Sequence, residues 1–351
     1  MTKYIGIMNK KTLPILLAVP LLLACETEVE KQVDVAEPVA LNLSSSISVS
    51  SVTRAYDSSW EKNDKIGVFT TATGTMTVTT SGSAADENIL YNVGVSSDTE
   101  TYDSSEDTYT YSSFSPNGTP IYLPADGSKV DVYAYYPYLA DVTAAGGRTI
   151  SVETTQTVAN QKTFDLMTAK VQSTVLAPIW RNNPNVKLLF CHVMSKVLIK
   201  VKRGTGYSDD DIKGQITQVV LEGQPTSGTF LPVAQTMSIN ATTATLTPCE
   251  VTSSDVDYDS SSDVLAQYRT IVFPNNKTDV VTGNEASSTG RTIVFTIGDV
   301  TYTYTITHAF QPGEQTTFTI TLSGKEVTVS AAITPWNPNF ESKTLYPVAT
   351  S

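Results

Sequence analysis

Four aspartates lie at the spacing of a calcium-binding loop. In the stretch "DVDYDSSSDVLA" they match the first, third, fifth and ninth positions of an EF-hand loop: Asp255, Asp257, Asp259 and Asp263. The sixth position, where glycine allows a sharp turn, is Ser260, and the twelfth, where a bidentate glutamate completes the ligand set, is Ala266. Because both features are missing, we expect no metal site and interpret the segment as a solvated hairpin loop.

Catalytic and redox side chains are scarce. The two histidines, His192 in "LLFCHVMSKVLIKV" and His308 in "ITHAF", belong to no hydrolase, metalloprotease, phosphate-binding or dinucleotide-binding motif. Cys191 and Cys249 fit no metal or redox spacing. We interpret Cys191 as a small buried hydrophobe, and a disulfide between the two is left open. The sequence therefore predicts no enzyme, no catalytic residues and no cofactor.

The first cysteine has the setting of a lipid-attachment site. Three lysines precede the apolar run Leu13–Leu23, which leads into "LLLAC". A basic start, a short apolar run and a small residue before cysteine are typical of an exported lipoprotein, and the run is too short to span a membrane. We predict a signal peptide over residues 1–24, lipidation of Cys25 and a flexible acidic tether over residues 25–38. A plain secretory signal cut nearby is the alternative.

Composition favours a β-rich extracellular protein. The 351 residues include 17 tyrosines, and serine and threonine are abundant, while helix-forming runs of Ala, Leu, Glu and Lys are missing. The formal net charge of −12 argues against nucleic acid or anionic lipid as the main partner.

The elements that must position any site are short strands. Between residues 39 and 52, one parity is apolar: Val39, Leu41, Leu43, Ile47 and Val49. From Val39 to Val49, Ser45 is the single polar exception, and the other parity is polar from Asn42 to Ser50. This period of two predicts a strand with one buried face. It ends just before Arg54, the first arginine of the chain.

Further strand patterns recur between loops rich in Gly, Pro, Asn, Asp and Ser. They cover Lys65–Thr70, Lys129–Tyr136, Val186–Lys202, Gln215–Leu221, Tyr268–Phe273, Arg291–Ile297, Thr301–Ile306, Thr316–Leu322 and Glu326–Ile333. Many short strands with frequent turns predict an all-β fold of two β-sandwich domains. The proline-containing stretch Val171–Asn185 places the boundary between residues 39–178 and residues 179–351.

A tyrosine cluster keeps a second function open. Aromatic rings in "YAYYPY" could stack on sugars, because each offers an apolar face and a polar handle. The alternation around them is more typical of a packed strand. The alternative function is therefore a monomeric surface lipoprotein that binds host or dietary glycans through Tyr135 or Tyr136.

Six stretches resemble the fimbrillin-like family, the subunits of type V pili in anaerobic Gram-negative bacteria. These are "TRAYDSSWEKNDKIGVF", "VDVYAYYPY", "FDLMTAK", "LLFCHVMSKVLIKVK", "FQPGEQTTFTITL" and "VSAAITPW". Together they span Arg54 to Trp336. The resemblance implies two tandem transthyretin-like β-sandwich domains, export as an outer-membrane lipoprotein precursor, and a structural and adhesive role in cell-surface fimbriae.

The resemblance also implies maturation by an arginine-specific protease and polymerisation by strand exchange. Arg54, followed by Ala55, matches the family's cleavage position. A cut there would free the body from its lipid and remove the strand over residues 39–52. If that strand fills a slot in the first domain, its loss exposes an apolar groove and an unpaired sheet edge.

A strand of another subunit would restore the pairing and the burial. One candidate donor repeats the apolar parity of the N-terminal strand: Val327, Val329, Ala331 and Ile333. The alternative is that this strand completes the second domain and that the last residues, including "TLYPVATS", donate. The expected partners are other pilin subunits and an arginine-specific protease, with a host protein or glycan ligand left open.

Overall fold

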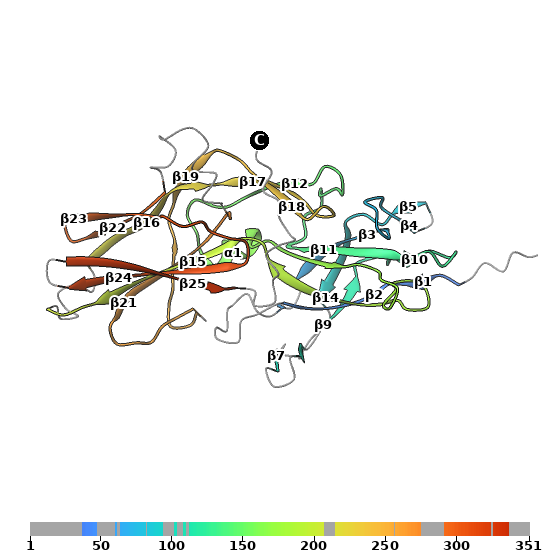
Figure 1. Ribbon diagram of the computed structural model, residues 1–351, viewed down its shortest axis with the longest axis horizontal. Coiled ribbons are helices and arrows are strands. Elements are labelled where there is room, and N and C mark those ends of the chain that lie inside the picture. Colours follow the sequence, from blue (N-terminus) through green and yellow to red (C-terminus); the bar gives the residue numbers. More distant parts are fainter. Residues whose placement is uncertain are drawn as a thin grey trace, which may run out of the picture. The chain divides into compact units, whose positions relative to one another are not determined.

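The computed structural model describes most of the chain between residues 37 and 336 (Figure 1). The described ranges are 37–47, 60–61, 64–81, 83–93, 102–103, 108–109, 112–206, 215–255, 257–274, 291–323 and 326–336. Cys25, Val49, Arg54 and Ala55 lie outside them, as do the predicted signal peptide and the last fifteen residues, 337–351. Within these ranges, no helix has the length and apolar character that crossing a bilayer requires.

Seven strands from the N-terminal part of the chain close into a barrel. In pairing order they are β11 (Val130–Tyr136), β13 (Met167–Val171), β14 (Asn185–His192), β2 (Asn42–Ile47), β9 (Ser112–Pro116), β6 (Ile89–Val93) and β3 (Lys65–Ala72). Strand β3 pairs back to β11, which closes the ring. Every neighbouring pair is antiparallel except β2 with β14, which run parallel.

The barrel core follows from strand alternation. Val132 and Ala134 of β11 belong to the buried cluster inside the barrel, together with Leu43 of β2 and Leu188 of β14. The opposite face of β11 is also buried, because Tyr135 belongs to the second core of the molecule. Strand β11 is therefore covered on both faces, and this explains its nearly continuous apolar and aromatic sequence.

Two larger sheets from the C-terminal part enclose the second core (Figure 1). The five-stranded sheet has the order β20 (Cys249–Glu250), β21 (Val264–Val272), β15 (Ser195–Arg203), β24 (Glu314–Ser323) and β25 (Glu326–Pro335). The four-stranded sheet has the order β19 (Thr243–Leu246), β16 (Ile216–Pro225), β22 (Thr292–Ile297) and β23 (Val300–Thr305). Ile199, Leu221 and Phe318 show how both sheets contribute to one buried cluster.

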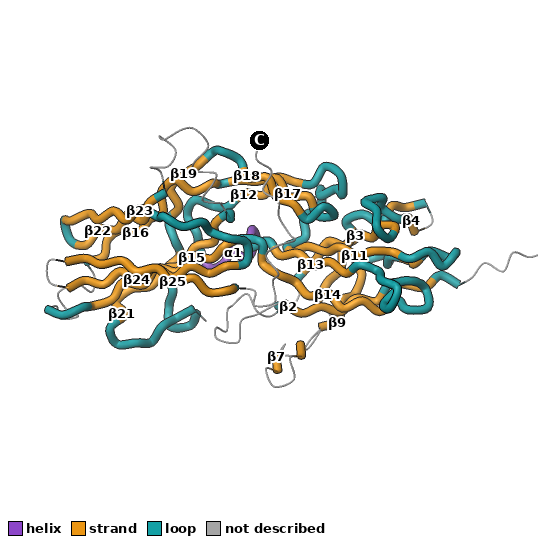
Figure 2. The backbone as a smooth tube through the Cα atoms, viewed as in Figure 1, coloured by secondary structure: helices purple, strands orange, loops and turns teal. Residues whose placement is uncertain are grey.

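The remaining described elements are small sheets and one short helix. A three-stranded sheet has the order β12 (Arg148–Ser151), β17 (Ser227–Leu231) and β18 (Thr236–Ile239). The two-stranded pairs are β1 (Val39–Ala40) with β10 (Tyr122–Leu123), β4 (Thr80–Ser81) with β5 (Ala84–Ala85), and β7 (Tyr102–Asp103) with β8 (Thr108–Tyr109). Helix α1 (Val158–Phe164) begins at Thr157, which forms a capping box with Asn160. Strands dominate the backbone in Figure 2.

The β-rich prediction is confirmed, although barrel strands such as β6, β9 and β13 were not predicted and one predicted strand is divided. The stretch Val186–Lys202, predicted as one strand, is two, because Val193 and Met194 interrupt it. Strand β14 pairs within the barrel and β15 within the five-stranded sheet, so the chain passes from one set of strands to the other at these two buried residues. The predicted division at residues 178 and 179 stays a prediction.

Candidate strand-exchange site

Strand β2 lies between two strands that are distant from it in sequence. On one side, Asn42–Ile47 pair in parallel with Asn185–Phe190 of β14. On the other side, Leu43–Ser45 pair with Ser112–Phe114 of β9. We call this position between β9 and β14 the strand slot. Among the described residues, β14 pairs with its other neighbour only at Cys191 and His192, so most of its ladder depends on β2.

The predicted buried parity of the N-terminal strand faces the barrel core. Leu41 and Leu43 are 3% and 4% exposed, and Val39 is half-buried. The two leucines together contribute roughly 3–6 kcal/mol of gross burial free energy. The backbone of Ile47 pairs with Phe190, and Val49 lies outside the described residues. A strand is thus present at residues 39–40 and 42–47, and its removal stays a prediction.

Trp60 closes an aromatic cluster that bridges the two sides of the slot. Its ring packs edge-on against Phe114 of β9 and Phe190 of β14, with ring centroids 5.3 and 5.0 Å apart. It also packs against Tyr136 of β11 at 5.4 Å. Sequence reasoning missed this contact. The available signal was Ser45, the one polar residue at an otherwise apolar parity.

The candidate donor residues lie on β25, at the edge of the five-stranded sheet. All ten residues of β25 pair with β24, and the other edge of β25 has no ladder partner among the described residues. Val327 and Val329 pack against the second core, whereas Ala331 and Ile333 are exposed. In this structure, then, β25 completes a sheet of its own subunit, and no described strand pairs with its outer edge.

The end of β25 is held by a buried stack. The ring of Trp336 lies on the ring of His192 with centroids 3.8 Å apart and an interplanar angle of 9°. Lys196 Nζ lies 5.0 Å from the centroid of the Trp336 ring, and His192 Nδ1 lies 2.9 Å from Asp165 Oδ1. His192 thus has a packing role between the end of β14 and the end of β25.

The four aspartates with calcium-like spacing contact cations of the protein. The ion pairs are Lys196–Asp257 at 3.1 Å, Lys200–Asp259 at 2.9 Å, Lys202–Asp263 at 3.1 Å, Arg269–Asp257 at 2.9 Å and Arg269–Asp255 at 3.9 Å. The lysines come from β15 and the arginine from β21, so the segment lies along the five-stranded sheet. The segment is the loop of the β20–β21 hairpin, as predicted, and most of its residues are exposed or half-buried. The prediction of a solvated loop is wrong for Asp257, whose side chain is 1% exposed.

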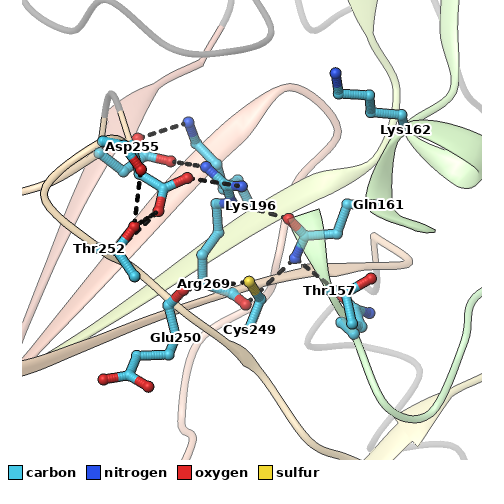
Figure 3. A network of polar contacts seen from close by, with 12 residues as sticks. Thr157, Gln161, Lys162, Lys196, Cys249, Glu250, Thr252, Asp255 and Arg269 are labelled. Carbon is cyan, nitrogen blue, oxygen red and sulfur yellow. Dashed lines mark hydrogen bonds and ion pairs between the residues drawn. The ribbon is translucent and has the colours of Figure 1, made fainter. Parts of the chain in front are cut away.

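A buried polar network continues from this segment into helix α1 (Figure 3). The Arg269 Nε donates to Gln161 Oε1 at 2.9 Å, and Gln161 Nε2 donates to Gln156 Oε1 at 3.0 Å. Gln156 in turn bonds both the N–H and the carbonyl of Ile271, at 2.8 and 2.7 Å. The network therefore fixes α1 and its N-terminal turn to β21.

Burial raises the pKa of the Asp257 carboxyl, but Lys196 and Arg269 lower it by more. The result is a pKa below the ordinary value of 3.8. The carboxylate is therefore the form that the fold stabilises, as expected for a buried acid held by two cations. No three metal-ligating side chains among the described residues are grouped so that they could hold an ion.

The structure also tests the possible disulfide and the possible sugar-binding tyrosines. Cys191 and Cys249 are not joined by a disulfide in this structure, so the disulfide left open above is not formed. Tyr135 is fully buried, and its hydroxyl donates to Asn88 Oδ1 at 2.8 Å. Tyr136 is half-buried and bonds Asp64. A sugar-binding platform built on Tyr135 is therefore wrong.

Comparison with known proteins agrees with this architecture. A protein of Bacteroides uniformis named "Putative fimbrium subunit Fim1C" is 29% identical over 334 residues, which cover 92% of this chain and 93% of that protein. A crystal structure of a "putative cell adhesion protein" from Bacteroides uniformis is 27% identical, has a TM-score of 0.59, and matches over 85% of this chain and 99% of its own. Another, from Bacteroides ovatus, shares the fold at 17% identity with a TM-score of 0.58, over 86% of this chain and 99% of its own.

The fold and the relatives define a class of fimbrial and cell-adhesion proteins. The model of the family described as fimbrillin-like matches residues 53–336, and the chain belongs to that family. It is a structural protein of the cell surface and not an enzyme.

Proposed function

We propose that this chain is a subunit of a cell-surface fimbrium that assembles by exchange of the strand in the slot. It would be exported as an outer-membrane lipoprotein precursor anchored through Cys25, with a body of two tandem transthyretin-like domains. Cleavage between Arg54 and Ala55 would release β1 and β2 together with the lipid anchor. A strand from another subunit would then enter between β9 and β14.

The observation that carries this proposal is the position of β2. It is the first strand of the barrel in chain order, and it lies between strands that come much later in the sequence, at residues 112–114 and 185–190. Its loss would leave both partners with unpaired backbone groups and an emptied apolar surface. An incoming strand restores hydrogen bonds through its backbone and burial through alternate side chains.

The proposed donor is a C-terminal segment of a second subunit. The slot belongs to the N-terminal barrel and β25 to the C-terminal sheet, so the two complementary surfaces differ. Such a heterologous contact repeats head to tail and builds a filament in place of a closed dimer. The proposed partners are therefore other fimbrial subunits and an arginine-specific protease, and an adhesion ligand of protein or glycan type would be bound by the assembled fimbrium.

Cleavage at Arg54 is the step to test first. Treating the full-length chain with an arginine-specific protease should remove the N-terminal segment and produce a ladder of oligomers on a denaturing gel without heating. Arg54→Ala should keep the segment and reduce the ladder to background. Arg181→Lys, which alters a different arginine whose side chain bonds the carbonyl of Ala125, should assemble like the wild type. A trimmed wild-type chain that stays monomeric, or ladders from uncut Arg54→Ala, would refute the proposal.

A further inference from the structure

Ser45 is anomalous in the strand slot. It lies at the apolar parity of β2 and is fully buried, next to Ser112 of β9 and Leu188 of β14. Its Oγ has no hydrogen-bond partner among the described residues. A buried hydroxyl without a partner is unfavourable. The polarity of Ser45 therefore does not account for its presence here, and its small size is the property that remains.

The position of Trp60 explains why a small residue is needed. Phe114 pairs with Leu43 on one side of β2, and Phe190 pairs with Ile47 on the other. Trp60 packs edge-on against both phenylalanine rings. A ring that reaches both must cross β2 between these two positions, on the core face, and the core-facing residue between them is Ser45. Like the Ser45 hydroxyl, the Trp60 indole nitrogen is buried without a partner among the described residues.

We infer that Trp60 acts as a size filter that sets the register of any strand in the slot. The strand must place a small side chain against Trp60 and larger apolar side chains before and after it. If the bound strand shifted by two residues relative to β9 and β14, the same face would stay buried, but a large side chain would meet the Trp60 indole. This inference rests on the proposed strand exchange for its role in assembly, whereas the packing of Trp60 against Phe114 and Phe190, from which the contact with Ser45 is inferred, exists in the unprocessed chain.

The filter discriminates between the candidate donors. Leu41, Leu43, Ser45 and Ile47 follow a pattern of large, large, small and large residues, and β25 repeats it as Val327, Val329, Ala331 and Ile333. To act as donor, β25 would first have to leave β24, with which all ten of its residues pair in the unassembled subunit. The filter then assigns Ala331 of the incoming subunit to the position against Trp60. The terminal "TLYPVATS" carries Pro347, which cannot donate a backbone hydrogen bond to the slot.

The contact itself is tested in the full-length chain, before any cleavage. Ser45→Leu should lower the folding equilibrium constant at least tenfold in the wild type, because the added side chain has no space. In a Trp60→Ala background the same change should cost less than twofold. Ser44→Leu, on the neighbouring residue of the other parity, should have the same effect in both backgrounds. An equal loss from Ser45→Leu with and without Trp60 would overturn the inference.

The role in assembly is tested on trimmed subunits. Ala331 and Ala332 are both exposed in the subunit, so leucine at either position should leave the fold intact. Ala331→Leu should reduce ladder formation at least tenfold, and Ala332→Leu, which would face away from the barrel core in the slot, should not. Adding Trp60→Ala to Ala331→Leu should restore the ladders. If Ala331→Leu formed ladders as the wild type does, the role of Trp60 as a size filter in assembly would be overturned. If trimmed wild-type chains formed no ladders, strand exchange would be refuted. The full-length test would then decide whether Trp60 contacts Ser45.

Discussion

Asp257→Ala should lower the free energy of unfolding by about 3–5 kcal/mol at neutral pH. Asp257 neutralises two buried cations, since Lys196 is 0% and Arg269 3% exposed. Removing the carboxylate leaves both positive charges buried without their shared partner. The resulting loss of stability is much larger than the net stabilisation that the ion pairs provide. Urea unfolding followed by tryptophan fluorescence would measure the loss.

The same row of ion pairs supplies a matched control. Asp263→Ala breaks a pair of the same type, but Asp263 is 45% exposed and Lys202 26% exposed. Solvent screens such a pair, so the expected loss is about 0–1 kcal/mol. Equal losses from the two variants would mean that the buried network does not hold the segment to the sheet.

The difference between the wild type and Asp257→Ala should also depend on pH. The pKa of Asp257 is lower in the folded chain than its ordinary value of 3.8. A lowered pKa stabilises the fold above the unfolded-state pKa, and the contribution is lost as the pH falls through the folded-state value. The two unfolding curves should therefore converge below about pH 4. A constant difference down to the acid transition would contradict this assignment.

Leu43→Ala should lower the free energy of unfolding of the unprocessed chain by about 2–5 kcal/mol. Leu43 is 4% exposed, and its neighbours in the ladder are Phe114 and Val186, both buried in the barrel core. The lost side chain leaves a cavity between two strands that cannot easily approach each other. Ser44→Ala, on the adjacent residue of the opposite parity, should change stability by less than about 0.5 kcal/mol.

Trimming provides an internal check on the Leu43 effect. Once the chain is cut after Arg54, residue 43 leaves with the released segment, so the variant and wild-type bodies have identical sequences. Their stabilities should then coincide. A difference that survives trimming and removal of the released segment would show that the N-terminal strand stays bound in the slot after the cut.

Local patterns predicted the longer strands, but they missed shorter ones such as β9 and β13 and did not predict which strands pair. The alternation in Lys129–Tyr136 and Glu326–Ile333 corresponds to β11 and β25, because a period of two reports which face of a strand is buried. The pairing of β2 with β14 joins Asn42 to Asn185, and no local pattern encodes a contact across that distance. The strand itself was therefore predictable, while the slot that holds it was not.

The ion pairs of the aspartates were not predictable from the sequence, for a physical reason. The sequence shows Asp257, Asp259 and Asp263 only beside their neighbours in the loop. That local pattern suggests calcium ligands or a solvated turn. Their partners are lysines of β15, some sixty residues earlier. Only the fold brings these aspartates next to the lysines of β15. Ser45 differs, because its departure from the apolar parity was visible in the sequence, although nothing in the sequence connected it with Trp60.

Amide hydrogen exchange in the two strands that border the slot tests the central claim most directly. The backbone amides of Ser112–Phe114 and Asn185–Phe190 should exchange slowly in the unprocessed chain, at least tenfold faster in freshly trimmed chains, and slowly again in assembled fimbriae. This order is expected because β2 pairs with both segments before the cut and a strand of another subunit would pair with them afterwards. Protection that is unaffected by trimming, or that does not return in the fimbriae, would contradict the account.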